Sequence, residues 1–168
     1  MQEEAKMEPN RKSVIVTGAA SGIGLAMTMG LVTDGHHVTA VDRNAAALAE
    51  LTKQAAGLKG HVQTVLADLA QPDSFAHVVG TALIRYGRID VLVNNAGVGQ
   101  ASVRDGDRSP IRFWDTTPEQ WGRFIAVNAA APINMARAVL PHMLAANPDH
   151  ASDLSKTRLA VAQGAEIA

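Results

Sequence analysis

The sequence predicts an α/β fold: a doubly wound parallel sheet with helices on both of its faces. Strand-like apolar runs alternate with helical segments between residues 13 and 146. The fourth apolar run is apolar in its interior, as parallel strands that are buried on both faces usually are. A glycine-rich stretch directly follows the first run. The length of 168 residues fits one domain with a single core.

The expected elements follow one another in a regular order. Strands are predicted at Ser13–Val16, His37–Val41, His61–Ala67 and Asp90–Val93. Helices are predicted from Ile23 to Asp34-Gly35, from Ala45 to about Ala56, from Gln71 to Tyr86 and from Pro118 to about Ala146. The strands are expected to be joined by right-handed crossovers. Residues 1–11 are expected to form a disordered arm, residues 12–146 the folded domain, and residues 147–168 a tail of uncertain structure.

Periodicity and caps justify the first two helices. In the helix from Ile23, apolar residues recur three and four apart and predict one buried stripe, formed by Ile23, Ala26, Met27 and Leu31. Asp34-Gly35 is a C-terminal signal for this helix. Asn44 is a good N-cap for the second helix, which stops before Gly57.

The same signals define the later elements. The third helix keeps a 3.6-residue period through Phe75, Val78, Val79, Ala82, Leu83 and Tyr86. Gly87 ends it, and the fourth strand follows. Residues 98–116 read as a long polar loop. Thr117, Pro118 and Gln120 then provide a cap, a proline at the first helical position and a capping-box residue for the last helix.

Composition excludes several classes of protein. A net charge of −1 gives no electrostatic basis for binding nucleic acid or an anionic membrane. The absence of cysteine excludes disulfides and thiolate metal sites, and no histidines lie at zinc-site spacing. Residues 1–12 lack the apolar core of a secretory signal, and no stretch approaches the roughly 18 apolar residues of a membrane helix. We therefore expect a soluble, cytoplasmic protein without a metal.

The stretch Thr17-Gly18-Ala19-Ala20-Ser21-Gly22-Ile23-Gly24 joins the first strand to the first helix. Gly18 permits a sharp turn, Gly22 close approach of a phosphate, and Gly24 tight packing of the helix on the strand. Free amides at the helix N-terminus would then face an anion. We expect a dinucleotide pyrophosphate here, bound by Gly18, Ser21, Gly22, Ile23 and Gly24. The competing interpretation is a merely flexible loop.

Asp42 lies at the end of the second strand, 18 residues beyond Gly24. This is near the spacing of about 20 residues expected for the acid that binds a ribose 2′-hydroxyl. A carboxylate accepts hydrogen bonds from the ribose and repels a 2′-phosphate, so NAD is favoured over NADP. Arg43 beside it could instead pair with that phosphate. Asp42 could also act only as an acid that stabilises a helix N-terminus.

The glycine-rich stretch, Asp42, Asp68-Leu69, Asn94-Asn95-Ala96-Gly97 and Asn128 together resemble the short-chain dehydrogenase/reductase family over residues 12 to 145. The resemblance implies a Rossmann-type sheet, here incomplete with about four strands in the order 3-2-1-4. It implies that Asp68 contacts the adenine with help from the backbone of Leu69. It also implies that Asn94, Ala96 and Gly97 border the adenosine ribose.

Asn128 can also be judged from its own helix. The expected buried stripe there is Trp121, Phe124, Ile125, Ala129 and Ile133, and Asn128 falls within it. Pro132 has no N–H, so the carbonyl of Asn128 cannot close its usual helical bond and a local kink is expected. In the family, the matching asparagine holds a water of the proton relay, which implies a catalytic role. The alternative is a purely structural polar kink.

The family's catalytic Tyr and Lys, four residues apart, are not found here. The single tyrosine, Tyr86, fits the core pattern of the third helix. Ser152 and Lys156 have the spacing, but with serine in place of tyrosine, and we treat this match as chance. We therefore expect a chain truncated before the catalytic pair, whose fourth strand forms an open apolar sheet edge.

The resemblance implies an oxidoreductase that transfers a hydride between NAD(H) and an alcohol or ketone. This chain is expected to be inactive because it is truncated, and the longer parent to be a homo-oligomer acting on a small molecule. The alternative function is a non-catalytic NAD-binding or interaction module.

Overall fold

The computed structural model describes residues 11–99 and 112–146. Its four strands form one parallel sheet in the order β3-β2-β1-β4, as predicted. The strands are β1 (Ser13–Thr17), β2 (His37–Asp42), β3 (His61–Leu66) and β4 (Val91–Val93). The expectations for residues 1–10, most of the 98–116 loop, the tail and the Ser152–Lys156 match lie outside the described residues.

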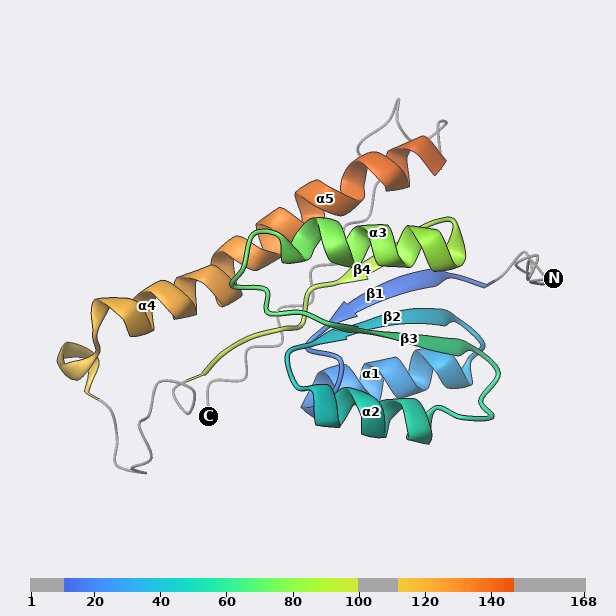
Figure 1. The fold of residues 1–168 in the computed structure, drawn as a ribbon, viewed down its shortest axis with the longest axis horizontal. Helices are drawn as coiled ribbons and strands as arrows, with labels where there is room; N and C mark the ends of the chain where they lie inside the picture. Colours follow the sequence, from blue (N-terminus) through green and yellow to red (C-terminus); the bar gives the residue numbers. More distant parts are fainter. Residues whose placement is uncertain (1–10, 100–111, 147–168) are drawn as a thin grey trace.

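Helices cover both faces of the sheet (Figure 1). On one face lie α1 (Gly22–Thr33) and α2 (Ala45–Gln54), and on the other α3 (Ser74–Tyr86) and α5 (Ala131–Ala146). Between β4 and α5 the chain forms a 3₁₀ turn, η2 (Phe113–Asp115), then α4 (Pro118–Ile125) and a π-helical segment, η3 (Ala126–Ala130). Residues 118–146 form one continuous helical run, called the long helix below.

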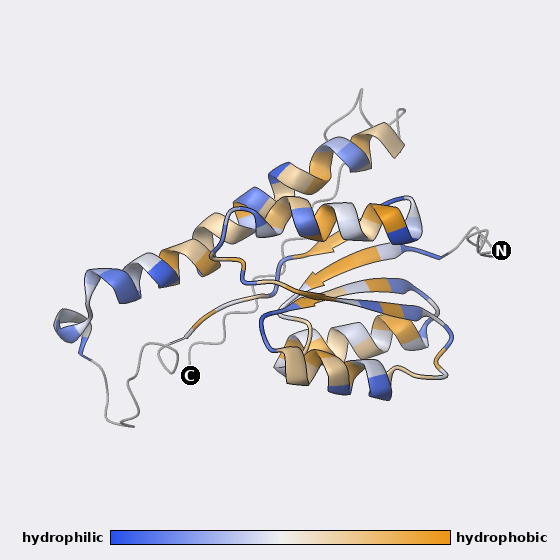
Figure 2. Cartoon of the chain, in the orientation of Figure 1, coloured by the Kyte–Doolittle hydropathy of each residue, from blue (hydrophilic) through white to orange (hydrophobic). Residues whose placement is uncertain are grey.

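A hydrophobic cluster fills the space on each side of the sheet. Side chains alternate between the faces of a strand, so Val14 and Val16 of β1 join the cluster under α1 and α2, while Ile15 joins the one under α3 and α5. All five residues of β1 are buried. Figure 2 shows the strands as the most hydrophobic layer of the molecule.

Most predicted boundaries agree with the structure to within a few residues. The Asn44 side chain accepts a hydrogen bond from the amide of Ala47 and so caps α2 as expected. Gly87 ends α3 with φ +71°, the left-handed conformation that glycine adopts readily. Thr117 and Gln120 form the complete capping box at the start of α4. The third helix begins at Ser74, three residues later than the predicted Gln71.

The predicted buried stripe of α1 is wrong. The buried positions are Gly24, Thr28 and Val32, four residues apart, whereas Ile23 is 52% exposed. A Cβ on Gly24 would lie only 2.0 Å from the carbonyl oxygen of Gly18. Helix α1 therefore approaches the end of β1 so closely that a residue without a side chain must face it.

The expected distortion at Asn128 takes the form of η3. The amide of Ala131 bonds to the carbonyl of Ala126, a five-residue step instead of the four of an α-helix. Pro132 explains why the distortion occurs here, since it cannot donate to Asn128.

The predicted stripe of the long helix is also wrong. Ile125 and Ile133 are 55% and 63% exposed, and Trp121 is 38% exposed. The buried positions are instead Val127, Ala131, Met135 and Val139. The wider turn of η3 shifts the register of the following residues, and only one side of α5 packs on α3 and the sheet. The side that was expected to be buried faces solvent.

The long helix is long and apolar enough, by length and composition, to cross a membrane. The expectation that no stretch reaches this threshold is therefore wrong. Arg123 and Arg137 lie within this run. One side of α5 packs against α3 and the sheet, so composition alone assigns no membrane span.

Strand β4 lies at the end of the described sheet and pairs only with β1. This confirms that, within residues 11–99 and 112–146, the fourth strand is an edge strand. Its three residues are all apolar. Such an edge offers unpaired backbone groups to another strand.

Candidate cofactor site

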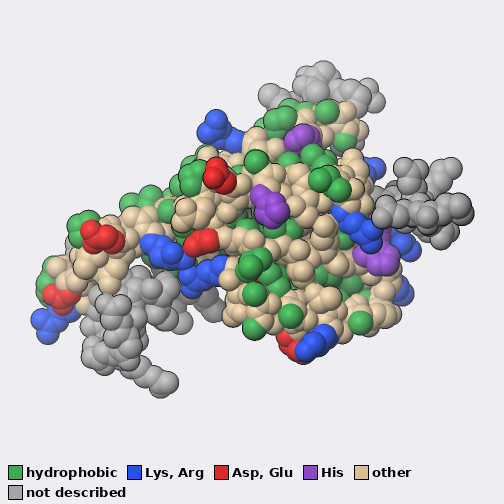
Figure 3. Space-filling view, in the orientation of Figure 1, with side chains coloured by type: hydrophobic (Ala, Val, Ile, Leu, Met, Phe, Trp, Pro, Cys, Tyr) green, Lys and Arg blue, Asp and Glu red, His purple; other side chains and the backbone are tan. Residues whose placement is uncertain are grey.

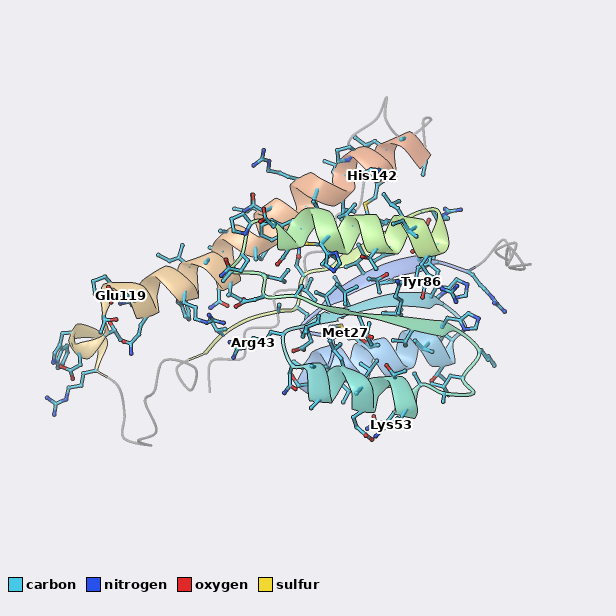
Figure 4. The ribbon with its side chains drawn as sticks, in the orientation of Figure 1. Met27, Arg43, Lys53, Tyr86, Glu119 and His142 are labelled. Carbon is cyan, nitrogen blue, oxygen red and sulfur yellow. The ribbon has the colours of Figure 1, made fainter. Side chains whose placement is uncertain are left out.

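An open cleft lies where the strands end at their carboxyl termini. Ligands of open α/β sheets bind at this edge, where the strand order reverses. Here β1 lies between β2 and β4, so the reversal falls at the glycine-rich turn. The lining residues come from every strand exit and from the long helix: Gly18, Ser21, Val41, Asp42, Arg43, Ala67, Asp68, Leu69, Ala96, Gly97, Val98, Arg123 and Val127. Figure 4 labels Arg43 at this edge.

The glycine-rich turn has the geometry that its spacing predicts. Gly18 and Gly22 have positive φ angles of 63° and 51°, which side-chain-bearing residues rarely adopt. A Cβ on Gly22 would meet no atom within 4 Å, so the space beside it is open. The side chain of Ser21 makes no capping hydrogen bond. The first turn of α1 therefore has no side-chain acceptor of its own and is suited to an anion.

Two residues that the sequence reasoning did not select hold this turn in place. Thr17 accepts hydrogen bonds from the amides of Asn95 and Ala96, both at 3.0 Å. The Asn95 side chain donates to the carbonyls of Thr17 and Gly18 at 3.0 and 3.2 Å. Both residues belong to recognised motifs, but only the pairing of β1 with β4 reveals that they bond to one another.

Asn94, by contrast, is buried and is absent from the cleft lining. Its side-chain amide donates to the carbonyl of Pro132 at 3.3 Å, joining β4 to α5. Its neighbours Ala96 and Gly97 do line the cleft. Asn94 therefore joins β4 to α5, while Asn95 joins the segment after β4 to the turn after β1.

Asp42 accepts hydrogen bonds from two backbone amides with its carboxylate. One carboxylate oxygen accepts from the amide of Ala20 in the glycine-rich turn at 3.1 Å. The other accepts from the amide of Asn44, the N-cap of α2, at 3.0 Å. Each oxygen has further lone pairs, and Asp42 lines the cleft, so it can also accept from a ligand hydroxyl.

Asp68 follows β3 and lies on the same wall of the cleft. One of its oxygens accepts from the amide of Ala70 at 3.1 Å. The other pairs with the guanidinium of Arg123 at 3.3 Å. Leu69 beside it is buried and also lines the cleft. Arg123 was not selected from the sequence, since nothing in its own helix indicates a partner 55 residues away.

Asn128 bonds twice to a single residue. Its side-chain oxygen accepts from the amide of Val98 at 2.8 Å, and its side-chain nitrogen donates to the carbonyl of Val98 at 2.8 Å. It therefore fastens the segment after β4 to η3. Asn128 does not line the cleft itself, but the residue that it holds does.

Tyr86 lies far from this cleft, as its core pattern predicts. Figure 4 places Tyr86 and Arg43 at opposite ends of the sheet. The ring of Tyr86 stacks on His37 with 5.1 Å between centroids. Burial raises the pKa of its hydroxyl, which is unfavourable for a proton donor to a substrate.

The strand order and the flanking helices define an α/β protein of the Rossmann type. A family model described as short chain dehydrogenase matches residues 12–150. The chain belongs to the short-chain dehydrogenase family, which confirms the resemblance read from its motifs.

Named relatives cover the same region. The chain is 37% identical over 133 residues to 3-oxoacyl-(acyl-carrier-protein) reductase FabG of Thermotoga maritima, covering 79% of this chain and 50% of that protein. The structure of L-sorbose reductase from Gluconobacter frateurii, complexed with NADPH and L-sorbose, is 30% identical with a TM-score of 0.71, covering 81% of this chain and 49% of that one.

A third similar protein is 3-ketoacyl-(acyl-carrier-protein) reductase from Brucella melitensis complexed with NADH. It is 30% identical with a TM-score of 0.67, and the match covers 78% of this chain and 50% of that one. The chain spans about half the length of the curated relatives it matches.

Proposed function

We propose that this chain is the NAD(H)-binding part of a short-chain dehydrogenase/reductase that interconverts an alcohol and a ketone. The hydrogen bond between Asp42 and the amide of Ala20 is the observation that carries this proposal. It supports the proposal because a carboxylate that could accept from a ribose hydroxyl lies beside the turn that would hold the pyrophosphate. The open space at Gly22 and the cleft along four strand exits fit a dinucleotide.

The preference for NAD over NADP rests on the carboxylate of Asp42. A carboxylate on the cleft wall attracts a ribose hydroxyl and repels a phosphate at the same position. Arg43 on the same wall is the competing feature. Similar structures contain NADPH in one case and NADH in another, so the support comes from Asp42 alone.

The bound nicotinamide would supply or accept the hydride, and the residues of this chain would hold it in place. The glycine-rich turn binds the pyrophosphate, Asp42 the ribose and Asp68 the base. Asn128 keeps the segment after β4 at the cleft through Val98. Its main-chain carbonyl, which Pro132 leaves without an α-helical donor, is the group that we assign to a proton-relay water.

We further propose that the 168-residue chain alone performs no turnover, because no tyrosine follows Asn128. The lack of a tyrosine after Asn128 in this sequence also supports the second candidate, a non-catalytic NAD-binding or interaction module. Both proposals share the cofactor site and differ only in the chemistry. A coding sequence that continues past codon 168 into a Tyr-x-x-x-Lys segment would favour the enzyme.

Titration of the purified chain with NADH and with NADPH, followed by calorimetry, tests the site. We expect NADH to bind more tightly than NADPH, and Asp42→Asn to reduce the preference about tenfold, since a hydrogen bond to a charged group contributes roughly 1.5–3 kcal/mol. Asp34→Asn, an exposed acid at the end of α1, is the matched control. Tighter binding of NADPH would overturn the preference, and absence of binding by either would overturn the cofactor assignment.

A further inference from the structure

Arg123 connects two parts of the molecule across the cofactor cleft. Its guanidinium lies 3.3 Å from a carboxylate oxygen of Asp68, and both residues line the cleft. Their side chains are 38% and 34% exposed, so both are partly buried. Figure 3 shows basic and acidic side chains side by side at the base of the projecting α4.

The carboxylate of Asp68 is held from two sides. The amide of Ala70, in its own loop, donates to one oxygen, and Arg123 of α4 holds the other. Because β3 lies beside β2 in the sheet, Asp68 lies next to Asp42 along the cleft wall. A base attached to a ribose at Asp42 would therefore extend toward Asp68, whose carboxylate is held by the guanidinium of Arg123.

Helix α4 lies at the rim of the described fold. No residue of α4 is buried, and the helix projects beyond the sheet in Figure 1. Arg123 is one of its half-buried residues, and it bonds to a loop at the opposite side of the cleft. A contact of this kind links the position of α4 to whatever occupies the space beside Asp68.

We propose that Arg123 is a positioning residue for the adenosine half of the cofactor. It orients the Asp68 carboxylate toward the base and couples the binding of that half to the position of α4. This inference rests on the proposed dinucleotide function. It concerns a residue that the motifs of the sequence did not single out.

Binding of cofactor fragments to four forms of the chain tests this role. The probes are NADH, ADP-ribose and nicotinamide mononucleotide, and the forms are wild type, Arg123→Gln, Asp68→Asn and the double variant. We expect Arg123→Gln to weaken NADH and ADP-ribose about tenfold, within the usual range of coupling between sites, and to leave nicotinamide mononucleotide unaffected. The double variant should bind like Asp68→Asn alone, since both act through one carboxylate.

Two controls separate positioning from general damage. Arg137→Gln removes the same charge from an exposed position of α5 outside the cleft and should leave all three affinities unchanged. Arg123→Lys should recover part of the lost affinity, because it restores the charge but not the flat guanidinium.

The coupling to α4 has its own readout. In a Trp114→Phe background, ADP-ribose should shift the fluorescence emission of Trp121 in α4, and Arg123→Gln should abolish that shift.

Unchanged or tighter binding of ADP-ribose by Arg123→Gln, with wild-type binding intact, would overturn the role of Arg123 and leave the proposed function standing. Tighter binding would mean that Arg123 competes with the base for Asp68. Failure of wild type to bind NADH and ADP-ribose would instead reject the proposed function together with this inference. If Arg123→Gln does not fold, Arg123→Lys takes its place. Losses of ADP-ribose affinity from Arg123→Lys and Asp68→Asn that simply add in the double variant would then contradict the proposal.

Discussion

Several polar residues of this chain each make two or more hydrogen bonds to the backbone. Thr17 accepts two amides from the segment after β4, Asp42 joins the glycine-rich turn to the cap of α2, and Asn128 makes a paired contact with Val98. Each of these contacts fixes a backbone segment that borders the cleft. The site is therefore organised by main-chain contacts before any ligand is present, which lowers the ordering cost of binding.

His37 is the residue whose protonation should control acid stability. It is buried at the start of β2 between the rings of His61 and Tyr86, each 5.1 Å from its own ring. Within the described residues its Nδ1 atom has no hydrogen-bond partner. Burial, followed by the charges of His61, Arg11, Arg85 and His36, lowers the pKa of His37 below 6.5.

A lowered folded-state pKa means that the unfolded chain binds the proton more readily. The stability contributed by neutral His37 is thus complete above about pH 6.5 and is lost as the pH falls toward the folded-state pKa. Thermal unfolding between pH 8 and pH 5.5 measures this loss. His37→Phe, which keeps a stacked ring but cannot titrate, should flatten the dependence, and an equally steep curve for the variant would contradict the assignment.

In helix α1, a close contact with the end of β1 decides which face of the helix is buried. The sequence pattern correctly placed the helix and its end, because glycines and caps act locally. It failed for the buried face, because the contact between Gly24 and the carbonyl of Gly18 depends on tertiary packing. The prediction for the long helix failed for the same reason: Pro132 predicted the distortion at Asn128, but not that Ile125 before η3 and Ile133 after it would both face solvent.

Two glycines of α1 provide a matched test of that packing. Gly24→Ala places a methyl group 2.0 Å from a backbone oxygen that cannot move aside, so we expect a loss of at least about 2 kcal/mol of unfolding free energy. Gly30→Ala, in the same helix, would meet no atom within 4 Å. It should stabilise the protein by about 0.5–1 kcal/mol, because alanine loses less conformational freedom on folding.

Urea unfolding of the two variants gives both values in one experiment. Gly24→Ala should also lose NADH affinity, since its methyl group would displace the turn that Gly18 begins. Equal effects of the two substitutions would show that helix propensity, and not contact with the turn, determines the need for glycine at position 24.

At the scale of the whole molecule, the sheet could be predicted and the solvent-facing surface could not. The parallel sheet follows from the alternation of elements, and its strand order follows from the Rossmann-type fold that the family resemblance implies. The cleft residues Gly18, Asp42 and Asp68 follow from strand ends and known motifs. The exposure of a residue depends on what else packs against the chain. The apolar residues of the long helix were predicted to be buried, but nothing in the described residues covers them.

That exposed surface predicts self-association of the chain. Ile125 and Ile133 are more than half exposed, and Trp121 lies on the same long helix. Exposed apolar side chains that lie together on a surface usually mark an interface. We expect sedimentation velocity to show association that rises with concentration, and the double variant Ile125→Lys/Ile133→Lys to remain monomeric with unchanged unfolding free energy.

Ile84→Lys is the control for this experiment. Ile84 is 90% exposed on α3, so the variant adds a charge while leaving the long helix intact and should associate like wild type. The open edge of β4 offers a second route to self-association, in which backbone groups of two chains pair with each other. Association through that edge would persist in the double variant and would form strand-rich aggregates instead of a defined oligomer. That result would transfer the interface from the long helix to β4.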